Sequence, residues 1–249
     1  MPESRRVSET TDDRLLDGRV IVRQPVNGYR AAVDPVLLAA AVRATSGQKV
    51  LDAGCGTGAA MFCLAARVPG LAITGLEIQQ SYAVLAGEGI ALNKLSETFI
   101  AVGDIARPPP DMTEAFDIVL TNPPYGDAGT PPPGASLAVA HMEGEIDVAA
   151  WIKGCLFCLR PKGRLVMIHR ADRLSDVLAA LSLYRCGDIR ILPVFPKVGA
   201  PARRVIIDAG KDRRSPDTLL PGLVLHEEGG AYTAAAENVL RRAHALAAA

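Results

Sequence analysis

The sequence has little of several features that mark particular classes of protein. Aromatic residues make up 4% of its 249 residues, and there is a single tryptophan. No apolar run approaches the ~20 residues that a membrane-spanning helix needs. The N-terminal residues 1–19 are polar and charged and have no apolar core of the kind that a signal peptide carries. We therefore expect a cytoplasmic protein that makes no membrane contact.

Cysteines are few, odd in number and scattered, without the paired spacing of a disulfide framework. The closest pair, Cys155 and Cys158, lies in an apolar helical pattern and has no second pair that would complete a metal site. We expect both side chains to face the core, and we expect no metal site.

Neither sign of charge is in excess, because 27 Lys and Arg balance 27 Asp and Glu. A neutral chain is not expected to coat nucleic acid by charge alone. The basic residues are more frequent in the second half of the chain, which would suit a polyanionic substrate that meets that half.

The chain does have a regular alternation of short apolar strands and helices. Strands are expected at 49–52, 71–77, 98–102, 116–120 and 163–169, and helices at 59–67, 79–93, 146–159, 172–183 and 234–246. Two further strands, 189–195 and 204–208, are expected to pair as an antiparallel edge hairpin. This pattern predicts an α/β fold with a mostly parallel, seven-stranded sheet and helices on both faces.

No clear linker divides the chain, so we expect residues 1–249 to form a single domain. Residues 1–18 are expected to be flexible, and 19–46 to form an N-terminal extension of a strand and a helix. Asp34 is the expected N-cap of that helix, with Pro35 at its first position. Residues 126–140 are rich in Gly and Pro and form either a mobile lid or a slack loop.

A glycine-rich loop follows the first of the predicted parallel strands. Gly54, Gly56 and Gly58 stand where a strand turns into a helix, so the backbone can approach a ligand closely and the helix N-terminus offers free N–H groups. The spacing, with Glu77 further on, also satisfies the dinucleotide fingerprint. The loop alone therefore leaves two kinds of cofactor open.

Acidic residues at the ends of three successive strands favour one of these two kinds of cofactor. Asp52 places a carboxylate immediately before the loop, where it would repel a pyrophosphate but attract an ammonium group. Glu77 can bind ribose hydroxyls, and Asp104 can accept from the exocyclic amine of an adenine. A ligand with a positive centre, a ribose and an adenine fits this set, which predicts S-adenosylmethionine rather than NAD.

A second motif, Asn122-Pro123-Pro124-Tyr125, follows the apolar strand predicted at 116–120. The prolines fix φ and remove two backbone N–H groups, so the turn presents carbonyl acceptors without competing donors. The Asn122 and Pro123 carbonyls can then grip a planar NH₂ group, while the Tyr125 ring stacks on the base that carries it.

The glycine loop 52–58 together with this turn resembles the class I S-adenosylmethionine-dependent methyltransferases that act on planar exocyclic nitrogens. More narrowly, the chain is similar to the bacterial tRNA(Val) adenine-37 N6-methyltransferase family, which modifies the adenine just 3′ of the anticodon. The resemblance implies a Rossmann-like class I methyltransferase fold and a tRNA partner. It also implies a catalytic role for Asn122, Pro123 and Tyr125.

The same resemblance implies two sets of binding residues. The cofactor is expected to contact Asp52, Gly54, Cys55, Gly56, Gly58, Glu77, Asp104, Asn122 and Asp34. The substrate is expected to contact Pro124 and Tyr125. Independently of the resemblance, the basic residues Arg170, Lys197 and Arg203 are candidates for substrate contacts: each either meets an RNA phosphate or is a solvated surface residue.

Several other functions fit parts of the pattern. A ribosomal RNA or DNA adenine, or the side-chain amide of a release-factor glutamine, poses the same chemical problem as a tRNA adenine. Release-factor methyltransferases carry a helical N-terminal domain, for which the residues before the first parallel strand are too few. A non-catalytic protein that uses the cofactor fold as a scaffold would be expected to lose Asn122 or the glycines, and both are intact.

Overall fold

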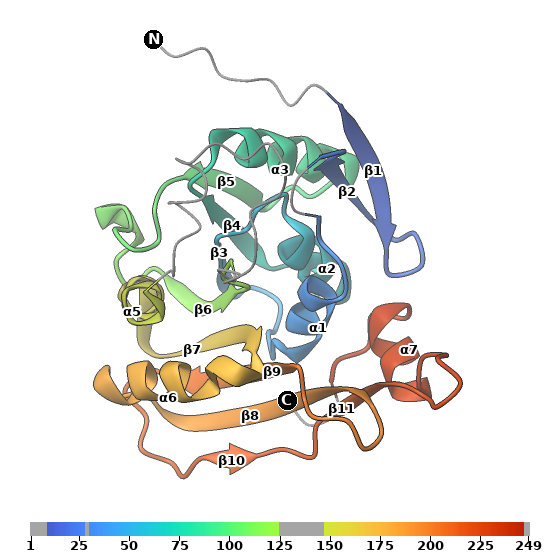
Figure 1. The fold of residues 1–249 in the computed structure, drawn as a ribbon. Coiled ribbons are helices and arrows are strands. Elements are labelled where there is room, and N and C mark those ends of the chain that lie inside the picture. The colour runs from blue at the N-terminus through green and yellow to red at the C-terminus, as the bar shows by residue number, and fades with distance from the viewer. Residues whose placement is uncertain (1–8, 28–29, 125–146, 247–249) are drawn as a thin grey trace.

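The computed structural model describes residues 9–27, 30–124 and 147–246. Within them, one nine-stranded sheet runs in the order β10-β8-β9-β7-β6-β3-β4-β5, and β11 also pairs with β8 (Figure 1). The strands of this sheet are β3 (Lys49–Ala53), β4 (Ala72–Glu77), β5 (Thr98–Val102), β6 (Phe116–Thr121), β7 (Leu159–Arg170), β8 (Gly187–Lys197), β9 (Arg204–Gly210), β10 (Thr218–Leu219) and β11 (Leu223–His226).

The sheet is mostly parallel, as predicted. β3 pairs in parallel with β4 and β6, β4 with β5, and β6 with β7, whereas β9 runs antiparallel to both β7 and β8. Because β9 is reversed, β8 points in the same direction as β7. The carboxyl ends of β3, β4, β5, β6, β7 and β8 therefore share one edge of the sheet, where α/β proteins bind their ligands.

Helices cover both faces, as Figure 1 shows. They are α1 (Asp34–Ala41), α2 (Ala59–Arg67), α3 (Gln80–Leu92), α5 (Val148–Cys158), α6 (Leu174–Leu183) and α7 (Ala234–Leu240), with 3₁₀ turns η1 (Pro110–Met112) and η2 (Ala171–Arg173). Alternate residues of each buried strand belong to different cores. Val50 and Ile118 pack with α1 and α2, whereas Leu51 and Val119 pack with α5 and α6. Cys155 and Cys158 are fully buried in the second core, as expected.

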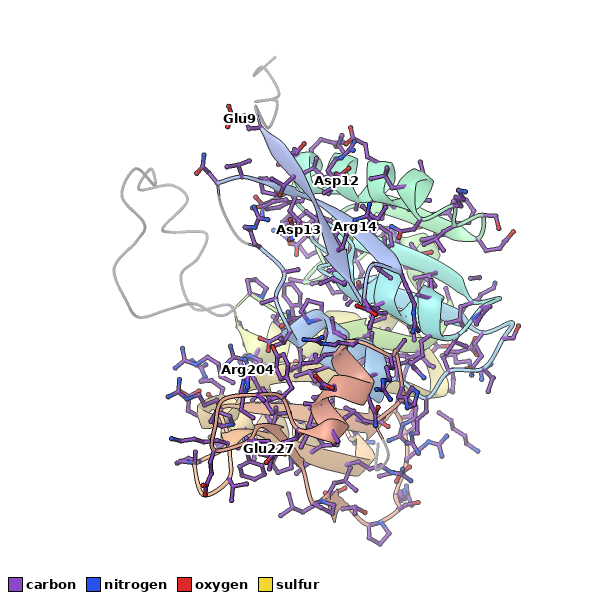
Figure 2. All side chains as sticks on the ribbon, turned by 90° about the vertical axis from the view of Figure 1, so that its right-hand side faces the viewer. Glu9, Asp12, Asp13, Arg14, Arg204 and Glu227 are labelled. Carbon is purple, nitrogen blue, oxygen red and sulfur yellow. The ribbon has the colours of Figure 1, made fainter. Side chains whose placement is uncertain are left out.

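The expectation that residues 1–18 are flexible is wrong for part of that segment. Thr10–Leu15 forms strand β1, which pairs antiparallel with β2 (Val20–Pro25). Figure 2 shows Asp12, Asp13 and Arg14 along β1. The hairpin is attached to the end of α3, because the Asn93 side chain exchanges hydrogen bonds of 2.9 and 2.6 Å with the backbone of Ile21.

Three further differences concern the ends of elements. The Asp34 side chain does not cap α1, whose N-cap position is Val33. The last helix ends at Leu240 rather than at 246. Beyond the seven predicted strands, β10 and β11 both pair with β8, so the β8–β9 hairpin is not the outermost part of the sheet. That the whole chain is one domain stays a prediction.

Candidate active site

The glycine loop runs from the end of β3 to the start of α2. Gly54, Gly56 and Gly58 all have positive φ, at +70°, +55° and +89°. A side chain in this left-handed region costs roughly 1–2 kcal/mol, which explains why glycines occupy it. Among the described residues, no atom apart from those of Gly56 and its two chain neighbours lies within 4 Å of a Cβ built on Gly56, so this part of the loop borders open space. A ligand can therefore lie directly against the backbone there.

Two carboxylates are buried behind the loop. Glu77, at the end of β4, accepts hydrogen bonds of 2.8 Å from the backbone N–H groups of Gly56 and Gln79. Asp52 is 2% exposed and accepts a hydrogen bond of 3.1 Å from the N–H of Met61. Burial raises the pKa of Asp52 to about 7, and the negative charge of Glu77 raises it further, whereas the Met61 bond opposes the rise.

The remaining predicted cofactor residues occupy different surroundings. Asp104 follows β5, where its carboxylate accepts a hydrogen bond of 2.8 Å from the Ala106 N–H. The Cys55 side chain is buried, and burial raises its pKa well above the ordinary value. Asp34 lies at the start of α1 and forms an ion pair of 2.9 Å with Arg204. Asp52, Glu77 and Asp104 thus stand at the ends of three adjacent strands, as predicted.

The predicted acceptor turn begins directly after β6. Asn122 is half-buried, Pro123 is buried and Pro124 is exposed. Ala53 and Thr121 are paired in the parallel register of β3 and β6, so the turn starts beside the first residue of the glycine loop. Tyr125 and the Gly- and Pro-rich loop 126–140 lie outside the described residues.

Two residues near the turn were missed by the sequence analysis. The hydroxyl of Thr121 donates a hydrogen bond of 2.7 Å to the carbonyl of Ala53 and accepts one of 3.0 Å from the indole N–H of Trp151. A Cβ built on Gly54 would lie 2.8 Å from the Trp151 ring, so this ring packs against the glycine loop. The only signals in the sequence are that Trp151 is the single tryptophan and that Thr121 precedes Asn122.

The three predicted basic contacts lie together at the same edge of the sheet. Arg170 ends β7, and the N–H of the next residue, Ala171, donates a hydrogen bond to the carbonyl of Arg203. Lys197 ends β8, which is separated from β7 by β9. Arg170 also forms an ion pair with Asp172. The sheet thus places Arg170 beside the hairpin loop that holds Lys197 and Arg203.

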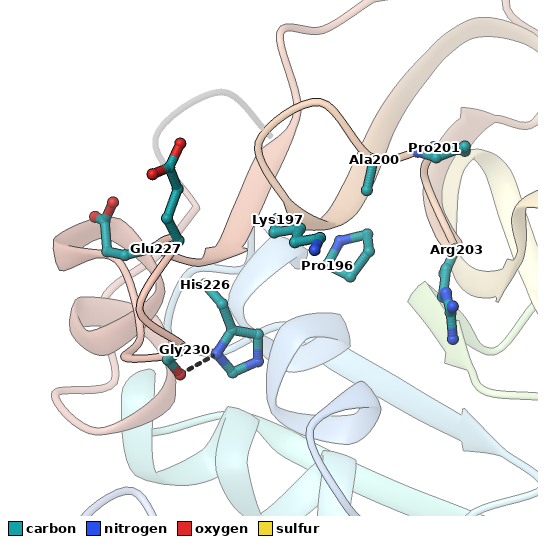
Figure 3. Close-up of a pocket in the computed structure, with 9 residues that line it drawn as sticks. Pro196, Lys197, Ala200, Pro201, Arg203, His226, Glu227 and Gly230 are labelled. Carbon is teal, nitrogen blue, oxygen red and sulfur yellow. Dashed lines mark hydrogen bonds between the residues drawn. The ribbon is translucent and has the colours of Figure 1, made fainter.

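Lys197 and Arg203 also line a pocket of about 510 Å³. In Figure 3, Glu227 and Arg203 lie on opposite sides of this pocket, with Lys197 and His226 between them. The ring of His226 stacks on Tyr232 with centroids 4.6 Å apart, and its Nδ1 lies 3.0 Å from the carbonyl of Gly230. The pocket thus combines two basic residues, two carboxylates (Glu227 and Glu228) and the His226 ring.

His169 is a titratable side chain close to the site, at the end of β7. It is 4% exposed, and its Nδ1 accepts a hydrogen bond of 2.9 Å from the N–H of Arg170. Burial lowers the pKa of His169, as does the positive charge of Arg173. A neutral ring that is held by the backbone fits a structural role.

Residues 9–27, 30–124 and 147–246 contain no group of three or more His, Cys, Asp and Glu side chains that could hold a metal ion. No helix in these ranges is long and apolar enough to cross a membrane.

The fold has close counterparts among solved structures. A predicted O-methyltransferase from Agrobacterium tumefaciens superposes with a TM-score of 0.70 at 25% identity, over 85% of this chain and 97% of that chain. A SAM-dependent O-methyltransferase from Thermotoga maritima gives a TM-score of 0.55 at 18% identity, over 76% of this chain and 68% of that chain. The architecture is that of the class I methyltransferases.

Sequence comparisons narrow the class. The methyltransferase small domain family matches residues 31–178. A tRNA1(Val) (adenine(37)-N6)-methyltransferase from Porphyromonas gingivalis is 30% identical over 75% of both chains, and one from Shewanella baltica is 26% identical over 86% of this chain and 91% of its own. The chain therefore belongs to the methyltransferase small domain family, which consists of S-adenosylmethionine-dependent methyltransferases.

The residues present fit the cofactor that this family uses. The space beside Gly56 is open, and its positive φ would be strained for a residue with a side chain. Both features suit a ligand that lies against the loop backbone. The carboxyl groups of Asp52 and Glu77 are buried behind the loop, and a ligand with a positive centre would stabilise their charged forms, whereas a pyrophosphate would not. Which atoms each residue contacts stays a prediction.

Proposed function

We propose that the chain transfers a methyl group from S-adenosylmethionine to the N6 amino group of an adenine in the anticodon loop of a tRNA. The observation that carries this proposal is the position of the Asn122-Pro123-Pro124 turn, which starts at the strand end next to the glycine loop. The names of the relatives support the tRNA substrate. A cytoplasmic location is part of the proposal.

The acceptor turn would make the amine reactive. The N6 lone pair of adenine is delocalised into the ring, so the nitrogen is a poor nucleophile. Hydrogen bonds from its two N–H groups to the side-chain carbonyl of Asn122 and the backbone carbonyl of Pro123 favour a pyramidal nitrogen with a free lone pair. No general base is needed before transfer, because an N–H proton becomes acidic once the nitrogen is alkylated and can then be released to water. The catalytic gain then comes from positioning and electrostatics.

The other residues would hold the two substrates. Bound S-adenosylmethionine supplies a methyl group that is activated by a positively charged sulfur. Gly54, Gly56 and Gly58 wrap the methionine end, Asp52 attracts its ammonium group, and Glu77 and Asp104 bind the ribose and the adenine. Cys55, Asp34 and Asn122 complete this set of cofactor contacts, while Pro124 and Tyr125 pack against the target base.

RNA flanking the target nucleotide would follow the carboxyl edge of the sheet. From β6 to β8 there are three strand spacings, or roughly 14 Å in a typical sheet. Arg170, Arg203 and Lys197 lie along that span and would contact phosphates, which position the RNA without reading its sequence.

The proposal is tested by offering separate acceptors to the protein with a labelled methyl donor. The acceptor pools are unmodified tRNA, ribosomal RNA, DNA and release factor, and the products are digested to nucleosides or amino acids. We expect label in N6-methyladenosine from tRNA. Label in ribosomal RNA, DNA or glutamine, or in a hydroxyl group, would instead show another acceptor and overturn the tRNA assignment.

A further inference from the structure

A single buried hydroxyl joins the two loops of the candidate site. Thr121 is completely buried at the end of β6. A hydroxyl has one proton, and here it is donated to the carbonyl of Ala53, while a lone pair accepts from the indole N–H of Trp151. Ala53 precedes the glycine loop, and Thr121 precedes Asn122. The bridge therefore lies immediately before both functional segments.

Trp151 contacts both segments through one rigid ring. It lies in the first turn of α5, and its six-membered ring covers the Cα of Gly54 so closely that a Cβ there would lie 2.8 and 2.9 Å from ring carbons Cζ2 and Cη2. The indole N–H is bonded to Thr121. A movement of the glycine loop would therefore push on a ring that is attached to the residue before Asn122.

Packing alone would not require this arrangement. Valine has nearly the same shape as threonine, and phenylalanine could cover Gly54 without a buried N–H that needs a partner. The hydrogen bonds of the Thr121 hydroxyl to Ala53 and Trp151 are directional, so they fix the position of this hydroxyl between the two loops. Positions of reacting groups matter strongly, since an error of about 1 Å can cost about 100-fold in rate.

We propose that Thr121 and Trp151 are positioning residues that couple the glycine loop to the Asn122 turn, so that a cofactor in the loop fixes the place of the amine acceptor. Neither residue is assigned a contact with the reacting atoms. The role of the turn rests on the function proposed above, whereas the response of Trp151 to cofactor depends only on the family assignment.

The first experiment compares Thr121→Val with Thr121→Ser in methyl transfer to tRNA. The valine variant lacks the hydroxyl, and the serine variant keeps it. We expect Thr121→Val to lower kcat about tenfold or more with less than about a threefold change in the KM for S-adenosylmethionine, and Thr121→Ser to stay within about threefold of the wild type. Thr113→Val, an exposed threonine whose hydroxyl bonds to Pro110, is the matched control.

The second experiment uses the single tryptophan as a probe and needs no acceptor. Trp151 emission is followed while S-adenosylhomocysteine is added, and its affinity is measured independently by calorimetry. We expect the emission to change with a midpoint at the calorimetric Kd in the wild type, in Thr121→Ser and in the control. In Thr121→Val we expect an emission change of a different size, although its affinity for S-adenosylhomocysteine stays within about threefold of the wild type.

The outcomes separate this inference from the proposed function. If the wild type binds S-adenosylhomocysteine without any emission change, or if Thr121→Val matches the wild type in both kcat and emission, the coupling is disproved. If no tRNA is methylated but the emission pattern is as expected, the proposed function fails, and only the coupling of Thr121 and Trp151 to the glycine loop stands. If Thr121→Val does not fold, Trp151→Phe takes its place. The phenylalanine ring can still cover Gly54, but it has no N–H to bond to Thr121. An unchanged kcat in Trp151→Phe would overturn the proposal.

Discussion

At the scale of single residues, Asn122 carries the proposed chemistry through one carbonyl oxygen. We expect Asn122→Ala to lower kcat for adenine methylation about 100-fold or more, as loss of a single preorganised hydrogen bond does elsewhere. Asn122→Asp keeps an acceptor oxygen at the same place and should retain more activity than the alanine variant. Single-turnover rates with labelled donor provide the measurement. Equal rates for wild type and Asn122→Ala would refute the acceptor role.

The buried carboxylate of Asp52 should make stability depend on pH. Its pKa is about 7 in the folded protein, raised by burial from an ordinary value of 3.8. Between these two values the folded state holds a proton that the unfolded chain has lost, so this group's contribution to stability falls as pH rises from about 4 to 7. The Asp52→Asn variant has no ionisable group at this position, so it should not lose this contribution to stability as the pH rises.

Urea unfolding at pH 5 and pH 8 tests this sign. The free energy of unfolding of Asp52→Asn relative to wild type should be higher at pH 8 than at pH 5 by about 1 kcal/mol or more. Contributions from the other carboxylates cancel in the comparison between variant and wild type. A difference that is the same at both pH values, or that is reversed, would contradict the burial argument.

How far the sequence predicts a residue's position depends on what determines that position. Asp52 and Glu77 could be placed because each ends a strand, and strand ends in a parallel sheet share one edge. The environment of Asp34 could not be predicted, since its partner Arg204 lies 170 residues away in β9. Trp151 was missed for a similar reason: its contact with Gly54 depends on how α5 crosses the sheet.

At the scale of elements, an ionic cluster joins the antiparallel end of the sheet to α1. Asp208 in β9 is 3% exposed and pairs with Arg164 of β7 at 2.5 Å and with Arg43, which follows α1, at 2.7 Å. Arg164 also bonds to Asp188 of β8 at 2.7 Å. One buried carboxylate thus contacts cations from two parts of the chain.

Removing that carboxylate should be costly. Asp208→Ala leaves the guanidinium of Arg164 half-buried without one of its two carboxylate partners, and we expect a loss of about 3 kcal/mol in the free energy of unfolding. Asp176→Ala, which breaks an exposed pair with Arg173, is the control and should cost less than about 1 kcal/mol. Urea unfolding gives both values, and equal small losses would show that the cluster does not stabilise the sheet.

Elements that consist of a continuous apolar segment were predictable, whereas those without such a segment were not. Helix 59–67 and strand 98–102 have the predicted bounds, because each is a continuous apolar segment between turn-forming residues. β10 has two residues and both are exposed, so it leaves no hydrophobic pattern to read. β1 alternates exposed and half-buried residues rich in Asp and Thr, and it is held as a strand by its pairing with β2.

At the scale of the whole molecule, the order of the strands turns a neutral chain into one with a local basic edge. Lys197 and Arg203 lie in the loop of the predicted hairpin, whereas Arg170 comes near them only because β9 lies antiparallel between β7 and β8. Long-range β pairing of this kind leaves little local signal. The proposed RNA path therefore depends on topology rather than on net charge.

This placement predicts which charges matter for RNA affinity. Each lysine or arginine that neutralises a phosphate adds about one unit to the slope of log K against log salt. We expect Lys197→Ala and Arg203→Ala each to weaken tRNA binding and to lower that slope by about one. Arg214→Ala is the matched control, because Arg214 is also exposed but lies at the opposite edge of the sheet. Its neighbour Arg213 packs against Gly187 at the start of β8. Fluorescence anisotropy with labelled tRNA across a salt series measures both quantities. If Arg214→Ala changes the slope as much as Lys197→Ala does, tRNA binds by general charge and does not follow the carboxyl edge.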